Sequence, residues 1–266
     1  MPRAGRKVAR VRTIRPAGAC NWGRTRARSS RSYLRSAYAR PVHRTGLAPR
    51  GASVSERGLE RVDLGEIPYT EAVEEMGTWV RQRQEGLIAD RLVLLSHPPV
   101  ITYSARTPRH ELPVQGGIPL VEVDRGGQAT YHGPGQLIGY LVMNLRERGP
   151  GDVVHWLEQG LIDALDSLGL EAVRRDTPPR AQSLVGVWTP EHRKVASIGM
   201  RIRGGVTSHG FALNVAPDLA EFSAFTACGL PEVEMTSLAE MAAAAGRPAP
   251  GEVAVREAVA AALGAV

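Results

Sequence analysis

The stretch RGGQATYHGPGQ, residues 125–136, is the most informative part of the sequence, because four glycines and a proline crowd into it. It lies between residues 118–123 and 137–145, two apolar runs that are typical of strands. Glycine permits a positive φ and a close approach of the backbone to a ligand. The spacing fits neither a dinucleotide fingerprint nor a phosphate loop, since it contains no G-x-G-x-x-G and no Gly-Lys-Ser/Thr. We therefore expect a tight connection between strands, with candidate ligand-binding groups in it.

The sequence on both sides of this stretch predicts helices interleaved with strands. Apolar spacing predicts helices over residues 67–87, 153–168 (with Asp152 as the cap), 237–245 and 252–263, and strands over 91–96, 100–104, 184–188, 195–202 and 205–215. This order lacks the regular alternation of a doubly wound sheet. We expect an α/β fold of the α+β type, a mixed β-sheet flanked by helices, in a single domain over residues 56–266.

The net charge of +6 is concentrated at the start of the chain. Of the 33 lysines and arginines, 14 fall in residues 1–50, which contain no acid, so the remaining 19 face 27 acidic residues, a balance of −8. A basic composition suggests nucleic acid or a membrane surface, but here only for the beginning of the chain. Two cysteines cannot build a disulfide framework, and no apolar run approaches the ~18 residues of a membrane-spanning helix. We expect a cytoplasmic protein that binds neither nucleic acid nor membrane.

Residues 1–55 are rich in arginine, alanine and serine without periodicity, and we interpret them as a basic, disordered extension. Three origins remain open: an organellar transit peptide, a nucleic-acid-binding arm, and upstream sequence translated from a misplaced start codon. We favour the last.

One lysine and one cysteine stand out in residues 51–266, where every other basic residue is an arginine. Lys194 lies in RKVASIG, residues 193–199, and Cys228 lies in FTACGL, residues 225–230. A lone lysine is ordinarily a solvated surface residue, and a lone cysteine is ordinarily a small buried hydrophobe. An ammonium can lose its proton when it is partly desolvated, and a thiolate near a cation is a nucleophile. The pair is a candidate nucleophile and cation.

Three blocks carry a resemblance to a known family. RGGQATYHGPGQLIGY, then KVASIGMRIRGGVTSHGFALNV, then DLAEFSAFTACGL with MTSL, together resemble the lipoyl(octanoyl) transferases, over about residues 59–245. The resemblance implies transfer of octanoyl from octanoyl-acyl carrier protein to a lysine of lipoyl domains, in 2-oxoacid dehydrogenases and the glycine cleavage H protein. It implies a fold shared with biotin and lipoate protein ligases. It implies no cofactor, no ATP and no metal, apart from the phosphopantetheine of the carrier.

The resemblance also assigns residues. Cys228 matches the acyl-thioester nucleophile, and Lys194 matches the residue that favours its thiolate. The substrate-binding positions fall in three stretches: Arg125, Gly126, Gly127, Gln128, Ala129, Thr130, Tyr131 and His132; Ser197, Ile198 and Gly199; Gly210, Phe211 and Ala212. The chain departs from the family in one place, since Ala227 stands where proline commonly precedes the cysteine.

Two other functions compete with this interpretation. A lipoate- or biotin-type ligase would activate a free acid with ATP and would also use a lysine, but it would not need Cys228. A non-catalytic acyl- or nucleic-acid-binding module has only the basic extension in its favour. Zinc-type spacing is absent around His132 and His209, which we expect to form hydrogen bonds that shape the pocket. We expect a structural role for His97.

Overall fold

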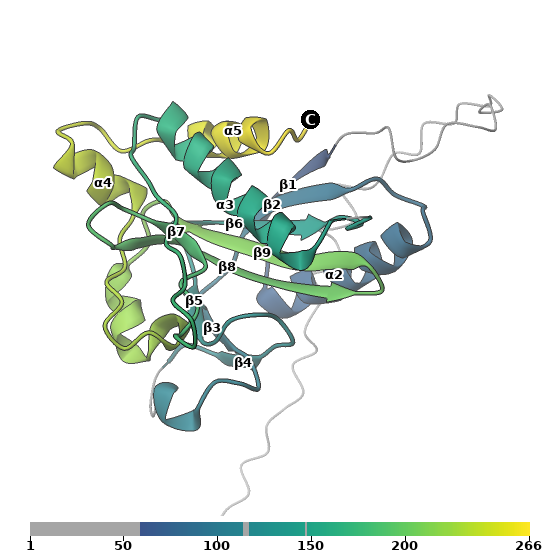
Figure 1. The fold of residues 1–266 in the computed structure, drawn as a ribbon, viewed down its shortest axis with the longest axis horizontal. Helices are drawn as coiled ribbons and strands as arrows, with labels where there is room; N and C mark the ends of the chain where they lie inside the picture. The colour runs from purple at the N-terminus through teal and green to yellow at the C-terminus, as the bar shows by residue number, and fades with distance from the viewer. Residues whose placement is uncertain (1–58, 114–116, 147) are drawn as a thin grey trace, which may run out of the picture. The chain divides into compact units, whose positions relative to one another are not determined.

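A six-stranded mixed sheet forms the centre of the computed structural model, which describes residues 59–113, 117–146 and 148–266 (Figure 1). The strands, in spatial order, are β1 (Glu60–Glu66), β2 (Arg91–Ser96), β6 (Gln136–Val142), β9 (Val206–Asn214), β8 (Lys194–Arg203) and β7 (Gly186–Trp188). β1 runs parallel to β2, and every other neighbouring pair is antiparallel. The expected mixed sheet is confirmed. The expected disordered extension, residues 1–55, lies outside the described residues.

A second sheet of three short strands follows the order β4 (Leu120–Glu122), β3 (Val100–Tyr103) and β5 (Thr130–His132). β5 lies inside the glycine-rich stretch and pairs antiparallel with β3. The expectation of a plain connection there is wrong, because three residues are too few for a periodic pattern to reveal a strand.

Helices cover both faces of the larger sheet (Figure 1). α2 (Tyr69–Gln84) packs on one face, and α3 (Pro150–Ser167), α4 (Leu238–Ala244) and α5 (Glu252–Ala262) pack on the other. Side chains alternate across a strand, so Leu92 and Leu94 join the α3 side while Val93 and Leu95 join the α2 side. All seven residues of β6 are buried, as expected of a strand covered on both faces.

The start of α3 differs from the expectation. The helix begins at Pro150 with Gly149 as its N-cap, and Asp152 lies in its first turn, where its carboxylate accepts a hydrogen bond from the Gly149 N–H at 2.8 Å. Proline suits the first helical position because its missing N–H would have no partner there. The cap expected at Asp152 is therefore wrong by one turn.

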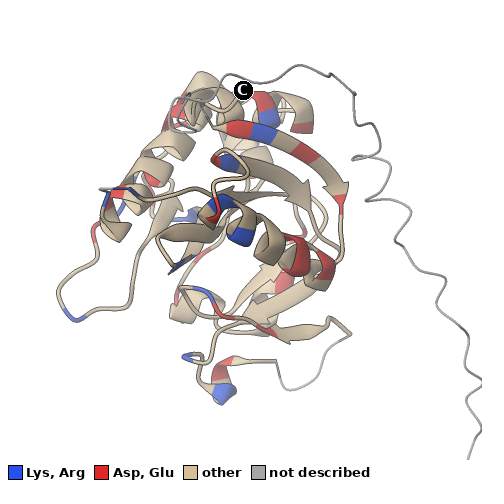
Figure 2. Cartoon of the chain, turned by 90° about the vertical axis from the view of Figure 1, so that its right-hand side faces the viewer, with Lys and Arg blue, Asp and Glu red and all other residues tan. Residues whose placement is uncertain are grey.

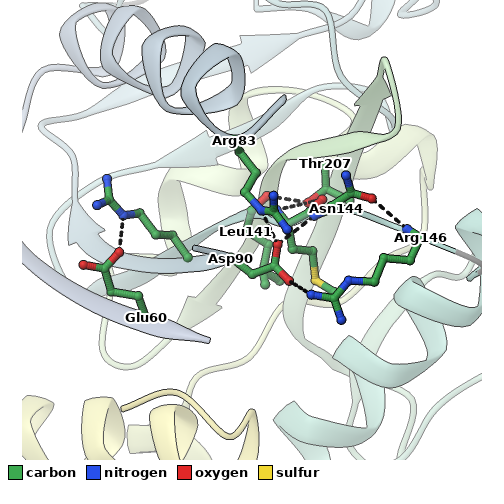
Figure 3. Close-up of polar contacts among 9 residues, drawn as sticks. Glu60, Arg83, Asp90, Leu141, Asn144, Arg146 and Thr207 are labelled. Carbon is green, nitrogen blue, oxygen red and sulfur yellow. Dashed lines mark hydrogen bonds and ion pairs between the residues drawn. The ribbon is translucent and has the colours of Figure 1, made fainter. Parts of the chain in front are cut away.

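A carboxylate with only 13% of its side chain exposed connects α2 to the sheet (Figure 3). Asp90 Oδ1 accepts hydrogen bonds from Arg83 Nε of α2 at 2.6 Å and from the Asn144 N–H at 2.9 Å. Its Oδ2 lies 3.5 Å from Arg146 Nη2. Arg83 is buried, so this ion pair holds the end of α2 against the end of β6.

Acidic and basic segments are interspersed over the helices and strands seen in Figure 2. In the part of the chain that is described, no helix is both long and apolar enough to cross a lipid bilayer.

Candidate active site

The site is a cavity of about 490 Å³ bounded by β8, β9, the glycine-rich stretch and the turn that carries Cys228. Fourteen of the sixteen residues expected at the site line it: Cys228, Lys194, Arg125, Gly126, Gly127, Gln128, Thr130, His132, Ser197, Ile198, Gly199, Gly210, Phe211 and Ala212. The structure thus brings together three blocks that are far apart in the sequence.

Cys228 lies in a 3-10 turn, η4 (Ala227–Gly229), with its backbone in the left-handed region at φ 58°. Its N–H donates a hydrogen bond to the Ala129 carbonyl at 2.7 Å, which ties the turn to the glycine-rich stretch. Its Sγ lies 3.5 Å from Ser197 Oγ on β8. Gly229 follows with φ 67°. The turn therefore presents a partly exposed thiol to the cavity.

Lys194 opens β8 and is only 1% exposed. Its ammonium Nζ donates a hydrogen bond to the Val185 carbonyl at 2.9 Å and lies 4.7 Å from the centre of the Trp188 ring. Its backbone N–H and carbonyl both bond the segment before α4, through Glu234 and Thr236. A carbonyl and an aromatic face both favour a cation, so the ammonium is held at the cavity wall without a directly bonded carboxylate among the described residues.

Arg125 supplies a second cation at the cavity. Its guanidinium donates to the Thr102 carbonyl at 3.0 Å, to Thr102 Oγ1 at 2.7 Å and to the Gly126 carbonyl at 2.9 Å. Burial lowers the pKa of Arg125, and the nearby Tyr69 and Cys228 oppose that shift. All three hydrogen-bond acceptors are neutral, so its positive charge remains available to an anionic group in the cavity.

Two glycines let the stretch approach β8 closely. The Gly126 N–H donates to the Met200 carbonyl at 2.9 Å. A Cβ on Gly126 would lie 2.9 Å from that carbonyl oxygen, and one on Gly199 would lie 2.7 Å from the Gly126 oxygen. A side chain at either position would push the glycine-rich stretch away from β8, so the close approach requires glycine here.

Three histidines and two tyrosines form one aromatic cluster beside the cavity. Tyr69 stacks on His132 with ring centres 5.8 Å apart and meets His97 edge-on at 5.1 Å. Tyr140 lies 6.1 Å from His209. His97 has the expected structural role, since its ring nitrogens bond the Ile67 carbonyl and the Tyr140 hydroxyl, each at 2.7 Å.

Burial dominates the titration of this cluster. Burial lowers the pKa values of His97 and His209 to about 4, and lowers that of His132 well below its ordinary value, with His97 and Arg125 adding to the effect. Burial also raises the pKa of Tyr69 to about 12. The histidines are therefore neutral near pH 7. Among the described residues, the His209 side chain has no hydrogen-bond partner, so the expectation that it forms hydrogen bonds is wrong. His132 has a partner only at Nε2, which lies 3.3 Å from Thr102 Oγ1.

Two expected residues do not line the cavity. Ala129 is fully buried and contributes its carbonyl to the Cys228 turn. Tyr131 points away and packs edge-on against Phe222, with ring centres 5.6 Å apart. Since neighbours on a strand face opposite sides, Thr130 and His132 line the cavity while Tyr131 supports it from behind.

Several lining residues were not among the expected site residues. They are Tyr69, Arg106, Ile138, Tyr140, Pro150, Val153, Val154, Gln182, Ser183, Val185, Met200, Ile202 and Thr207. Most come from elements whose apolar pattern only indicates burial, so the sequence carries no signal that separates them from core residues. His209, which was expected to shape the pocket, also lines it. No group of three or more His, Cys, Asp or Glu side chains could hold a metal ion within the described part of the chain.

Comparisons with known proteins identify the family and the fold. Residues 68–263 match the family described as "Lipoyl protein ligase A/B catalytic domain". A lipoate-protein ligase A solved with bound ATP has the same fold, with a TM-score of 0.59 and 16% identity over 77% of this chain and 84% of that one. A bi-partite lipoate protein ligase from Thermoplasma acidophilum also has a TM-score of 0.59, with 17% identity over 79% and 86%. The fold and the site thus define a lipoyl ligase or transferase catalytic domain.

Relatives in sequence narrow the class. An octanoyltransferase from Frankia casuarinae is 47% identical over 193 residues, covering 71% of this chain and 87% of that protein. An octanoyltransferase from Acidobacterium capsulatum is 38% identical over 200 residues, covering 68% and 79%. The chain belongs to the octanoyltransferase family.

Proposed function

We propose that this octanoyltransferase carries the octanoyl group on Cys228 as a thioester, between an octanoyl-acyl carrier protein donor and an acceptor lysine. The acceptors are lipoyl domains of 2-oxoacid dehydrogenases and the glycine cleavage H protein. The observation that carries the proposal is the arrangement of Cys228 and Lys194 on the walls of one cavity. They are the one cysteine and the one lysine of residues 51–266.

The first step is an exchange of thioesters. The Cys228 thiolate attacks the octanoyl carbonyl, a new S–C bond forms, and the bond to the phosphopantetheine sulfur breaks. The departing thiolate takes up a proton and leaves as a thiol. One thioester replaces another, so the step is nearly balanced in free energy and needs no ATP. The Lys194 ammonium and the Arg125 guanidinium both favour the anionic sulfur.

The cavity has apolar walls suited to an acyl chain. Val153, Ile198 and Phe211 line it, and the latter two are paired across β8 and β9. Apolar walls exclude water, which would hydrolyse the acyl-enzyme. The carbonyl end of the chain then lies toward the polar side, where Cys228 is.

The second step forms the amide. The neutral amine of the acceptor lysine attacks the Cys228 thioester, the C–N bond forms and the sulfur leaves. A proton must depart from the attacking nitrogen, and its acceptor is either Lys194 in its neutral form or the departing thiolate. The histidines, whose pKa values are lowered by burial, are poor acceptors at neutral pH.

Intact-mass spectrometry after mixing with octanoyl-acyl carrier protein tests the intermediate. The wild-type chain should gain one octanoyl group that hydroxylamine removes, and Cys228→Ser should gain none by this route. Cys20→Ser is the matched control, because it removes the other cysteine of the chain and should still be acylated. An octanoyl adduct of equal yield on Cys228→Ser would overturn the proposal.

The choice of donor separates this mechanism from a ligase. Octanoyl-acyl carrier protein without ATP should acylate a lipoyl domain, whereas octanoate with ATP should not. Transfer that occurs only with octanoate and ATP would assign the chain to the ligases instead.

A further inference from the structure

A carboxylate is buried behind Lys194. Glu158 lies on α3 and is only 2% exposed. It follows Val154 by one helical turn and therefore shares the apolar side of the helix that faces the sheet. A buried carboxylate costs several kcal/mol of free energy unless hydrogen bonds or charges compensate it. Its position therefore calls for a specific partner.

The partner is the peptide group between Val185 and Gly186. The Gly186 N–H donates to Glu158 Oε1 at 2.9 Å. On the other side of the same peptide group, the Val185 carbonyl accepts the hydrogen bond from Lys194 Nζ, also at 2.9 Å. One peptide group thus connects the carboxylate to the ammonium.

The polarity of this chain of contacts is favourable throughout. The negative carboxylate faces the positive end of the peptide dipole, and the positive ammonium faces its negative end. Hydrogen bonds in series polarise one another, so each strengthens its neighbour. Hydrogen bonds to charged groups are also stronger than neutral ones.

Gly186 makes the close approach feasible. Its φ is 139°, and a Cβ there would lie 2.5 Å from the Ala196 oxygen and 2.8 Å from Lys194 Cε. Any side chain would push Lys194 away from the peptide group. The glycine, the buried carboxylate and the lysine therefore form one arrangement built from α3, β7 and β8.

We propose that Glu158 is a positioning residue for Lys194: by fixing the Val185–Gly186 peptide, it holds the ammonium at the cavity wall toward Cys228. This rests on the proposed role of Lys194. Within the described part of the chain, the charged or titratable groups near Lys194 include Arg175, which lies over the same Trp188 ring at 4.8 Å, and Arg125 and Cys228, which line the same cavity. Two of these are cations that repel the ammonium, so its position depends on the hydrogen bond to the Val185 carbonyl, which the contact of Glu158 with the Gly186 N–H keeps in place.

Chemical acetylation of lysine in the absence of substrate tests the proposal. The chain contains two lysines, so peptide mapping compares Lys194 with Lys7 as an internal reference in the same molecule. In the wild type, Lys194 should react far more slowly than Lys7. Glu158→Met replaces the carboxylate with an apolar side chain of similar length, which cannot accept the hydrogen bond from the Gly186 N–H. This substitution should raise the reactivity of Lys194 relative to Lys7 by at least about tenfold.

Two further variants at position 158 distinguish the effect of side-chain length from a general disturbance of the fold. Glu158→Gln keeps a carbonyl oxygen at the same reach and should restore the protection of Lys194 to within about threefold of wild type. Glu158→Asp keeps the charge but is one methylene shorter, so it should expose Lys194 as Glu158→Met does. Asp166→Ala, on the exposed side of the same helix, is the matched control and should change nothing.

Enzyme kinetics and the alkylation of Cys228 distinguish a positioning role of Glu158 from a merely structural one. Glu158→Met should lower kcat with octanoyl-acyl carrier protein by at least about tenfold while KM changes little, and should move the pH profile of Cys228 alkylation upward. The proposal is overturned if Glu158→Met and Glu158→Asp both leave Lys194 protected and the alkylation profile unmoved. Lysine reactivity needs no acyl transfer, so this outcome is distinct from a failure of Cys228 to form an adduct.

Discussion

Three histidines beside the cavity are neutral because they are buried, and this has a consequence for acid stability. The pKa values of His97 and His209 are about 4 in the folded chain, against 6.5 when exposed. Between these values the unfolded chain binds more protons, so stability is full above pH 6.5 and falls as the pH decreases toward 4.

When the pH is lowered from 7 to 5, we expect the free energy of unfolding to fall by about 2 kcal/mol for each of His97 and His209. Urea titrations at the two pH values measure this loss. His209→Asn, which tolerates the positive φ of that position, should reduce the loss by about 2 kcal/mol. His155→Asn, on the exposed side of α3, should leave it unchanged. An equal loss in all three proteins would contradict the neutral, buried state of His209.

The composition of the chain singled out Lys194 and Cys228, because each is the single residue of its kind after residue 50. The resemblance then assigned half of the residues that line the cavity, 14 of 28. Tyr69, Tyr140 and Glu158 were not predicted at the site, because apolar periodicity indicates only that a position is buried. Glu158 did leave one signal, a carboxylate on the apolar side of a helix, and only the structure pairs it with Gly186.

Strands and helices with strong apolar patterns were predicted almost to the residue. β2 has the predicted bounds, Arg91–Ser96, and α5 begins as predicted and ends one residue early. α2 begins two residues later and ends three residues earlier than predicted. β1 was missed because its sequence, ERVDLGE, is charged and belongs to an edge strand. β5 was missed because its three residues pair with β3, a contact that is not local in the sequence.

The link between α2 and the sheet depends on Asp90, and its removal should destabilise the whole fold. Asp90→Ala leaves Arg83 buried without a carboxylate, and we expect a loss of about 3 kcal/mol in the free energy of unfolding. Asp63→Ala is the matched control. Asp63 also bonds two arginines, Arg61 and Arg256, but it is 42% exposed, so its loss should cost less than about 1 kcal/mol. Urea denaturation compares the two variants, and equal losses would show that burial of Asp90 contributes nothing.

The two ends of the described domain are fastened to each other. The Arg61 N–H donates to the Val266 carbonyl at 2.9 Å, and the Val266 N–H donates to the Leu59 carbonyl at 3.0 Å. These bonds hold β1 at the edge of the sheet, next to β2. The basic residues that give the chain its positive net charge precede this point, and the remainder of the chain is acidic.

A chain that starts at residue 59 should therefore keep both fold and activity, because β1 and its bonds to Val266 are intact. We expect its kcat and KM with octanoyl-acyl carrier protein to stay within about twofold of the full chain. A chain that starts at residue 67 loses β1 and should unfold at a lower temperature. Loss of activity in the longer of the two truncated chains would show that residues 1–58 take part in the reaction.

At Cys228 the proposed catalytic role and the stability of the fold favour different residues, because the backbone there is left-handed. For a residue with a Cβ atom, the left-handed conformation costs roughly 1 kcal/mol of conformational free energy, whereas glycine adopts it freely. Glycine would relieve the strain and abolish the thiol in the same substitution. In the proposed mechanism such a chain is inactive, so selection for heat resistance alone would favour loss of the cysteine, and only selection for turnover would retain it.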